Sequence, residues 1–344
     1  MTVEDPGRQR FRAAGAWLSP ALLVLIGLLA VASLAIGPAQ IPVLTAAKAL
    51  FTDQGSASII VREIRLPRMI LAILIGGALG ITGAALQGLL RNPLADASVF
   101  GAPQAAALGA VLVLYFGFAG ALSWTLPLAA IVGALVSIAL VVGVAGREGG
   151  TVVLVLAGLA IGSLAGAATS LAISLSPNPF AITEIVFWLL GSLEDRAMTH
   201  VLLAAPFLVL AGGLLLSTGP ALRALTLGEE AAASLGVNVG RTRLLIVAAS
   251  AIGAGASVAV AGAIGFVGLV TPHLVRPFVG YDPARTLVPS GLAGAALLLA
   301  ADCAVRVIPS GVEVRIGVLT ALLGVPVFLW IIVRRPAELA GAVP

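Results

Sequence analysis

The side chains best suited to catalysis or metal binding are few in this chain and do not form a recognisable set. Histidine occurs only at His200 and His273, and the single cysteine is Cys303. A metal centre needs three or four such ligands close together, and a nucleophile needs a base beside it. Neither histidine belongs to a His-Glu-x-x-His motif. We therefore expect no catalytic residue and no bound metal, and for His273 we favour packing or hydrogen bonding over iron ligation.

The sequence offers no obvious energy source for transport or catalysis. It lacks the Gly-x-x-x-x-Gly-Lys-[Ser/Thr] loop that cradles nucleotide phosphates, so ATP would have to bind to another chain. Transporters driven by an ion gradient usually carry carboxylates or histidines within their membrane spans. Asp302 is the nearest candidate, but Arg306 follows it by one helical turn and can neutralise it. We expect a partner to supply the energy, with an ion-coupled secondary transporter or channel as the alternative.

One short polar segment interrupts the apolar sequence. Glycines bracket it, adjacent carboxylates open it and alanines follow, which favours a short helix. Its residues are Gly228, Glu229, Glu230, Ala231, Ala232, Ala233, Ser234, Leu235 and Gly236. The spacing resembles the EAA-and-glycine coupling segment of ABC importer permeases, which fits into a groove on a cytoplasmic ATPase. The alternative is an ordinary solvated loop helix.

The overall composition places most of the chain in a membrane. Hydrophobic residues make up 60% of the 344 positions, charged residues only 10%, and the mean hydropathy is +1.14. Soluble domains carry about a quarter charged residues. The 41 glycines suit spanning helices that pack through small side chains. Arginines at span ends account for the net charge of +4, so we expect no nucleic-acid partner.

Apolar stretches of roughly 20 residues, the length a helix needs to cross the hydrocarbon core, occur about ten times. They lie at 14–36, 67–90, 98–117, 121–145, 151–175, 198–218, 243–263, 268–280, 287–307 and 314–333. We therefore predict an all-α polytopic membrane protein with about ten transmembrane helices. Residues 41–51 and 182–193 have helical apolar spacing but are too short to cross, which favours interfacial or re-entrant helices.

The arginines predict the orientation. Arg8, Arg10 and Arg12 precede the first span, and Arg334 and Arg335 follow the last. Basic residues favour the cytoplasmic side, so an even number of spans places both termini in the cytoplasm. Residues 1–13 then form a cytoplasmic tail and residues 219–242 a cytoplasmic coupling region. This topology leaves an unexpected group of arginines outside: Arg62, Arg65, Arg68, Arg196, Arg306 and Arg315.

Four longer motifs follow one another along the chain. They are Arg65-Leu66-Pro67-Arg68, the segment Gly83 to Asp96 with Arg91-Asn92-Pro93-Leu94, the glycine-rich segment Gly262 to Arg276, and Gly317 to Phe328. Their order and spacing from Arg62 to Trp330 resemble the FecCD-type, BtuC-like permeases, which import ferric siderophores, haem and cobalamin. One departure is Arg315, because the family more often has an uncharged Leu-Pro before this glycine.

The resemblance implies that residues 1–344 form a single permease domain that pairs with a second copy of itself. It also implies two cytoplasmic ATPase subunits, which would hold ATP and Mg, and a periplasmic substrate-binding protein. This chain would be a translocation subunit and not an enzyme, with no cofactor of its own. The bracketed segment from Gly228 to Gly236 would contact the ATPase.

The same resemblance assigns two further sites. Asn92 and Leu94, together with Gly150 and Thr151, would form the cytoplasmic gate, with simple loop chemistry as the alternative. Arg65, Arg68 and Arg306 would form basic sockets for glutamates of the binding protein, with snorkelling of long side chains to the interface as the alternative.

Localisation and cargo follow from the family. We expect a multi-pass protein of the bacterial inner membrane, surrounded by lipid. A pathway of Ala, Gly, Leu and Val suits a bulky, partly apolar chelate. We expect the cargo to be an iron complex, either a ferric siderophore or haem. A cobalamin importer permease is the first alternative.

Overall fold

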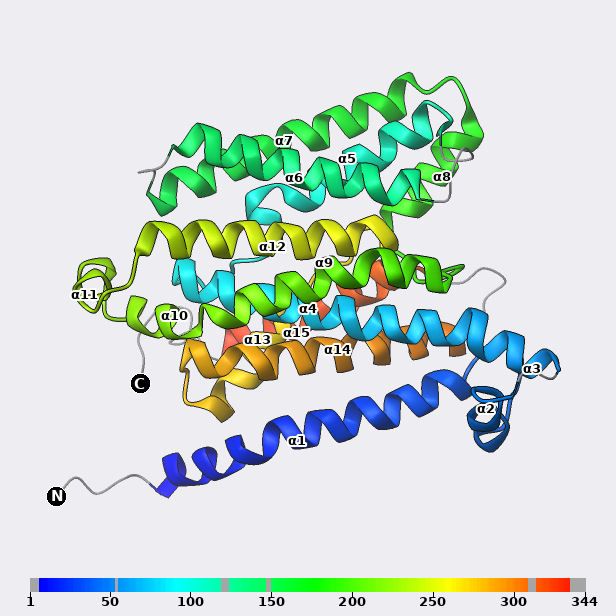
Figure 1. Ribbon diagram of the computed structural model, residues 1–344, viewed down its shortest axis with the longest axis horizontal. Helices are drawn as coiled ribbons and strands as arrows, with labels where there is room; N and C mark the ends of the chain where they lie inside the picture. Colours follow the sequence, from blue (N-terminus) through cyan, green and yellow to red (C-terminus); the bar gives the residue numbers. More distant parts are fainter. Residues whose placement is uncertain (1–5, 53–54, 119–123, 147–149, 309–313, 335–344) are drawn as a thin grey trace.

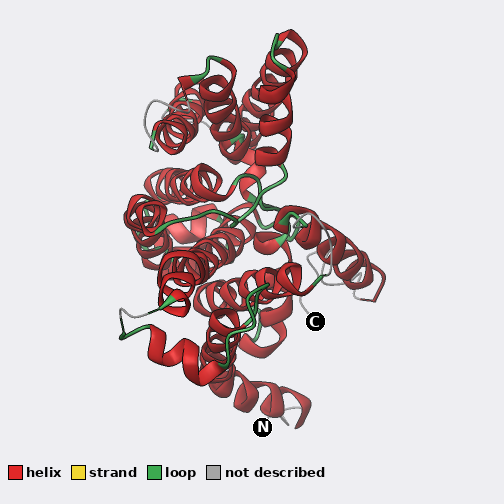
Figure 2. Cartoon of the chain, turned by 90° about the vertical axis from the view of Figure 1, so that its right-hand side faces the viewer, coloured by secondary structure: helices red, strands yellow, loops and turns green. Residues whose placement is uncertain are grey.

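The chain folds into a bundle of helices that run approximately along one axis (Figure 1). The computed structural model describes residues 6–52, 55–118, 124–146, 150–308 and 314–334. Within these residues the regular elements are all helical, as the colouring of Figure 2 shows. The predicted all-α fold is confirmed.

The long helices carry the apolar sequence. They are α1 (Pro6–Ala35), α4 (Leu66–Leu90), α5 (Ala102–Tyr115), α6 (Thr125–Ala145), α7 (Thr151–Leu175), α9 (Met198–Ser217), α12 (Val239–Ala261), α14 (Pro283–Val307) and α15 (Ile316–Arg334). The helix α1 begins earlier than the predicted first span, so residues 6–13 of the predicted tail are helical.

Short helices connect the long ones. They are α2 (Val43–Ala49), α3 (Ser56–Ile59), the π-helical turn η1 (Ile60–Arg65), the 3₁₀ turn η2 (Ala97–Phe100), α8 (Pro179–Leu189), α10 (Gly219–Leu225), α11 (Glu229–Ser234), α13 (Val267–Val275) and the 3₁₀ turn η4 (Arg276–Val279). The helices α2 and α8 coincide with the two segments predicted to be too short to cross.

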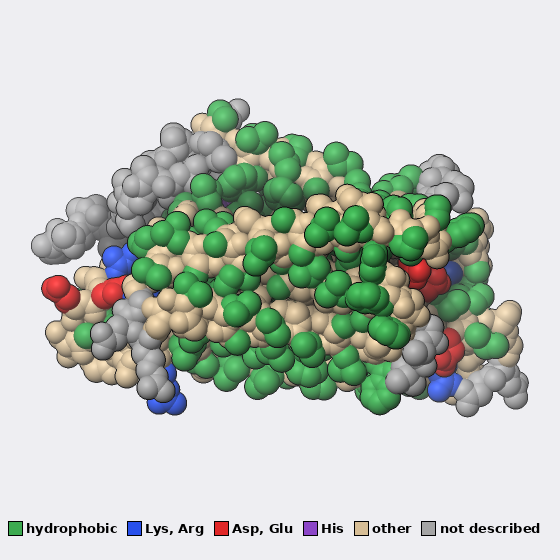
Figure 3. All heavy atoms as spheres, turned by 90° about the horizontal axis from the view of Figure 1, so that it is seen from above, with side chains coloured by type: hydrophobic (Ala, Val, Ile, Leu, Met, Phe, Trp, Pro, Cys, Tyr) green, Lys and Arg blue, Asp and Glu red, His purple; other side chains and the backbone are tan. Residues whose placement is uncertain are grey.

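Seven of the described helices are long and apolar enough to span a membrane, so the count of ten is approximate. The predicted spans outside these seven are the third, the eighth and the tenth, and the described apolar part of the tenth is Ile316–Trp330. The helix α5 has 14 residues and α13 has nine, or roughly 21 and 14 Å at 1.5 Å per residue, less than the hydrocarbon core of about 30 Å. Figure 3 shows hydrophobic side chains along the middle of the visible face and charged ones towards its ends.

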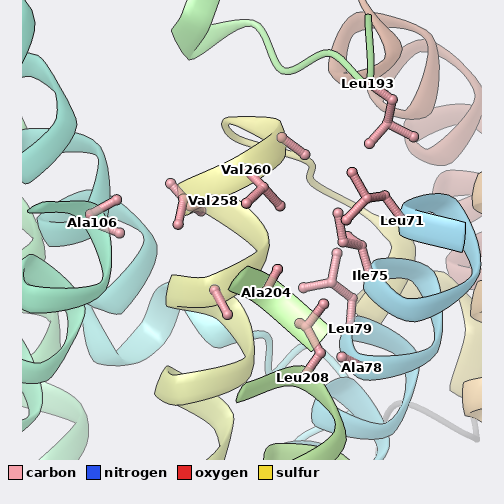
Figure 4. Packing of buried hydrophobic residues seen from close by; sticks show 14 of the residues in the cluster. Leu71, Ile75, Ala78, Leu79, Ala106, Leu193, Ala204, Leu208, Val258 and Val260 are labelled. Carbon is pink, nitrogen blue, oxygen red and sulfur yellow. The ribbon is translucent and has the colours of Figure 1, made fainter. Parts of the chain in front are cut away.

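The helices α4, α12 and α14 form the centre of the bundle. In the most apolar 18-residue window of α12, 78% of the residues are buried, compared with 6% for α1 at the edge. Small residues allow the central helices to touch, because a Cβ at Gly76 of α4 would lie only 2.3 Å from the carbonyl oxygen of Gly294 in α14. Figure 4 shows larger side chains of α4, α9 and α12, including Ile75, Leu208 and Val260, filling the space between helices.

Candidate coupling, gating and docking sites

The polar segment predicted to be a helix forms α11, which projects at one end of the bundle (Figure 1). The predicted brackets are confirmed, because Gly228 is the N-cap residue and Gly236 has a left-handed φ of 85° just after the helix. The amide of Val237 donates to the carbonyl oxygen of Ala232 at 3.0 Å, which closes the helix end. The glycines therefore determine where this helix starts and stops.

Only one side of α11 is attached to the bundle. Ala232 is fully buried, and the Glu229 carboxylate lies 2.8 Å from the Arg243 guanidinium of α12. Leu227 and Leu235, on either side of the helix, are 69% and 66% exposed. A helix that is anchored on one side and carries exposed leucines can dock into an apolar groove of a partner. Its contact with an ATPase remains a prediction.

The predicted gate residues Asn92 and Leu94 lie in a tight turn after α4. Arg91 ends the helix in a left-handed conformation with φ 47°, and its guanidinium donates to the carbonyl oxygen of Leu225 in α10. The Asn92 side-chain oxygen accepts the amide hydrogen of Leu94 at 2.9 Å. Leu94 is 49% exposed. The turn therefore holds an apolar side chain outward beside the coupling region.

His273 supports this turn from α13. Its Nε2 lies 2.9 Å from the carbonyl oxygen of Pro93. The centre of its ring lies 6.1 Å from the centre of the Phe328 ring in α15. The predicted packing and hydrogen-bonding role of His273 is confirmed. Within the described residues, no group of three or more histidine, cysteine or acidic side chains could hold a metal ion.

Gly150 and Thr151 begin α7, where Gly150 is the exposed N-cap residue. The turn η2, which follows the Asn92 segment, packs directly against α7. A Cβ at Gly158 of α7 would lie 2.5 Å from the carbonyl oxygen of Val99. The element after the Asn92 turn thus contacts the helix that Thr151 begins, and the joint action of these residues as a gate stays a prediction.

The three arginines predicted to dock a binding protein are buried within the chain. Arg65 donates to the carbonyl oxygens of Leu34 and Ala35, each at 2.7 Å, and of Ala39 at 2.5 Å. Arg306 donates to those of Ser33 at 2.8 Å and Ile36 at 3.0 Å. Both arginines thus satisfy carbonyl groups around the end of α1 that the helix itself leaves unpaired.

Arg68, the third arginine, belongs to a buried cluster of charges with Asp302 and Arg306. Asp302 is fully buried and lies 2.5 Å from Arg68 and 2.8 Å from Arg306. The predicted pairing of Asp302 with Arg306 is confirmed. The sequence pattern missed Arg68, because it lies 234 residues away from Asp302. The side chains of these arginines are buried and are not exposed basic sockets in this structure. Docking of a binding protein by these residues stays a prediction.

Arg315, the departure from the family pattern, holds two elements together. Its guanidinium lies 2.6 Å from the Glu194 carboxylate and 5.1 Å from the centre of the Phe187 ring of α8. These contacts connect the start of α15 to α8 and to the loop that follows it. The extra charge thus has an internal partner.

A cavity of about 660 Å³ opens next to this contact. Its lining combines aromatic and charged side chains, including Phe180, Phe187, Trp188, Glu194, Arg196 and Arg315. Burial lowers the pKa of the Arg196 guanidinium, and the neighbouring Asp195 carboxylate opposes this shift. Among the described residues, the buried Nε atoms of Arg196 and Arg315 have no hydrogen-bond partner. Only the charged run at 194–196 between apolar stretches could have indicated this cavity from the sequence.

A second cavity of about 360 Å³ lies deeper, between α4, α5, α7 and α12. Asp96, Gln104 and Thr169 line it together with the unwound backbone from Gly262 to Gly265. Gly262 has φ 68°, and a Cβ there would lie 2.1 Å from the carbonyl oxygen of Trp188, so only glycine fits. Irregular backbone at membrane depth is expected where it lines a cavity or packs in protein.

These features define a multi-pass membrane protein with internal cavities, broken helices and a short exposed helix at one end, as expected of a transport permease. The sequence profile of the FecCD transport family matches residues 23–334. The chain belongs to this family. It is therefore a permease of the ABC importer type, in which the subunit that spans the membrane is not itself an enzyme.

Relatives and a solved structure agree with this assignment. The chain is 40% identical to the ABC transporter permease protein YvrB of Bacillus subtilis, over 83% of this chain and 81% of the relative. It is 39% identical to the cobalamin import permease BtuC of Halobacterium salinarum (86% and 79%) and 39% identical to the hemin transport permease HmuU of Yersinia pestis (81% and 84%). An inward-facing metal-chelate type ABC transporter matches with a TM-score of 0.83 and 31% identity, over 92% of this chain and 98% of that one.

Proposed function

We propose that this chain is the permease subunit of an ATP-driven importer that moves an iron complex, either a ferric siderophore or haem, into the cytoplasm. A periplasmic binding protein would deliver the complex, and two ATPase subunits would bind ATP and Mg. The permease would act as a homodimer in the bacterial inner membrane, with both termini in the cytoplasm. The observation that carries the proposal is α11, because the exposed Leu227 and Leu235 on either side of it offer an apolar contact at the end of the bundle.

Three sets of residues have proposed roles in this cycle. The segment from Gly228 to Gly236 would transmit ATPase movements through the Glu229–Arg243 contact to α12. Asn92 and Leu94 would close the pathway on the cytoplasmic side together with Gly150 and Thr151. Docking of the binding protein near Arg65, Arg68 and Arg306 remains part of the proposal, although their guanidinium groups are used inside the chain.

The cavity of about 660 Å³ beside Arg315 supports a chelate as cargo. Phe180, Phe187 and Trp188 offer flat apolar surfaces, and the Nε atoms of Arg196 and Arg315 are hydrogen-bond donors. This combination suits a large ligand with rings and anionic groups. Cobalamin is the second candidate, because the similarity to a cobalamin permease equals that to a hemin permease.

The decisive experiment is reconstitution of the permease into liposomes with its ATPase and binding protein. We expect one of haem, a ferric siderophore and cobalamin to stimulate ATP hydrolysis and to accumulate inside the vesicles. Omission of the ATPase should abolish uptake. Uptake that follows an ion gradient without the ATPase would instead support a secondary transporter.

A further inference from the structure

A cleft separates the start of α1 from the corner between η4 and α14, at the end of the bundle where α11 lies (Figure 1). Its volume is about 930 Å³, and its lining includes Gly15, Ser19, Phe278, Asp282, Arg285 and Val288. At its floor α1 touches η4 directly, because a Cβ at Gly15 would lie 2.3 Å from the carbonyl oxygen of Phe278. The helix α1 lies at the edge of the bundle, where only 6% of its most apolar window is buried, so the cleft is open to the surroundings of the chain.

We propose that this cleft binds an anionic phospholipid of the cytoplasmic leaflet, with the phosphate at Arg285 and an acyl chain along α1. The expected position of the cleft across the membrane agrees with this ligand. Trp17 lies two residues from Gly15 and is 74% exposed. Exposed tryptophans at span ends mark the level of the lipid headgroups. The cleft therefore lies where a lipid phosphate would be.

The charge at the mouth of the cleft favours an anion. The Asp282 carboxylate lies 2.7 Å from Arg223 and 3.7 Å from Arg285, so one negative charge faces two positive ones. The Arg285 side chain is 69% exposed and reaches Asp282 only at the longer distance. A guanidinium in this position can donate two parallel hydrogen bonds to a phosphate.

The apolar walls favour a lipid over free phosphate. Ala16, Phe278 and Val288 line the cleft, and such apolar surfaces would contribute nothing to the binding of an inorganic anion. An acyl chain would cover them.

The test uses the full-length permease, purified and then mixed with phosphatidylglycerol or phosphatidylcholine, with bound lipid counted by native mass spectrometry. We expect preferential retention of phosphatidylglycerol. Arg285→Gln should reduce this retention about fivefold, the ratio for about 1 kcal/mol per basic residue at an anionic surface. Ser19→Phe, which fills the cleft and keeps every charge, should also reduce it.

The matched control is Arg241→Gln, which removes an exposed arginine from the start of α12, outside the cleft. It should retain phosphatidylglycerol like the native protein. Equal losses in Arg241→Gln and Arg285→Gln would overturn the proposal in favour of general surface attraction. Full retention in both cleft variants, or complete displacement of the lipid by inorganic phosphate, would overturn it as well.

Discussion

At the scale of single residues, the outward arginines illustrate how burial changes the meaning of a charge. The topology predicted from the sequence places Arg65, Arg68 and Arg306 on the side where basic residues are disfavoured. In the structure, these guanidinium groups bond to the end of α1 and to Asp302. Their internal bonds provide a structural reason for arginine at these positions, independent of any partner.

The first prediction concerns the buried cluster. Asp302→Asn would leave Arg68 and Arg306 buried without their shared counter-charge, which typically costs about 3–5 kcal/mol. We expect a large drop in the thermal unfolding midpoint of the purified permease. Glu63→Gln, at an exposed carboxylate towards the same end, should change stability by less than about 0.5 kcal/mol. Equal midpoints for Asp302→Asn and the native protein would refute the structural role of the cluster.

A second prediction separates structure from docking at Arg65. Arg65→Gln removes hydrogen bonds to carbonyl groups near the end of α1, so we expect a loss of about 1–3 kcal/mol of stability. If Arg65 also docks the binding protein, the association rate should fall and become less sensitive to salt. Binding kinetics at low and high salt, measured beside thermal unfolding, distinguish the two roles. Unchanged stability with slower association would favour a pure docking role.

At the scale of elements, short helices and turns carry the proposed partner contacts. The helix α11 is held by Ala232 and Glu229, and α10 is tied to the end of α4 through Arg91. Asp282 connects α10 to the start of α14, because Arg223 of α10 lies 2.7 Å from its carboxylate. Movement of α11 can therefore reach the turn at Asn92 through a few polar contacts.

The coupling helix gives the third prediction. Gly236→Arg adds a charge and a long side chain at an exposed position with φ 85°, so it should uncouple ATP hydrolysis from uptake. Gly236→Asn is the matched control, because asparagine tolerates left-handed backbone better than other residues. We expect uptake to persist in the asparagine variant and to fall at least tenfold in the arginine variant. Normal uptake by Gly236→Arg would remove the coupling assignment.

The fourth prediction concerns pH at the start of α14. Burial raises the pKa of the Asp282 carboxyl, but hydrogen bonds from Arg223, Arg285 and Ala284 outweigh it and leave that pKa below its usual value. The ionised group therefore adds stability above the ordinary aspartate pKa of about 4, and this stability is lost as the pH falls through that value towards the lowered pKa.

Asp282→Asn tests this directly, because asparagine still caps the helix but carries no charge. The stability difference from the native protein should be about 1 kcal/mol near neutral pH, as the pair is partly exposed, and should vanish in acid. Thermal unfolding at a series of pH values measures it. If the stability difference between Asp282→Asn and the native protein stayed constant with pH, the stabilising role of the ionised Asp282 carboxylate would be contradicted.

At the scale of the whole molecule, two cavities lie along the bundle, one beside the charged loop at 194–196 and one deeper, beside the unwound segment at 262–265. The coupling helix α11 and its neighbour α10 are at the opposite end of the bundle from α8 (Figure 1), and Arg91 attaches the Asn92 turn to α10. This arrangement suits a pathway that closes near Leu94. In the proposed homodimer, two such turns would face each other.

The last prediction tests that closure. Cys303 is the only cysteine and is buried, so Cys303→Ser provides a cysteine-free background. Leu94→Cys in this background should form a disulfide between two copies when the gate is closed, visible as a dimer on a non-reducing gel. Leu235→Cys, which is more exposed than Leu94 but lies just after α11, should not. Absence of the Leu94 crosslink in every nucleotide state would contradict a gate at this turn.

The sequence by itself determined the class of protein, the approximate spans and the limits of α11. These properties depend on local composition, because hydropathy over about 20 residues reports membrane insertion and glycines report where a short helix ends. The family followed from four motifs whose order along the chain is itself a sequence property.

Only the tertiary structure decided which charges are buried, that α5 is shorter than its predicted span, and where the cavities lie. Arg68 meets Asp302 and Arg315 meets Glu194 across long stretches of chain, so no local spacing predicts either pair. The sequence pattern predicts that Arg65 and Arg306 are surface charges, but in the structure the end of α1 packs over them. Burial is a property of packing between distant segments, and a linear pattern of residue types does not contain it.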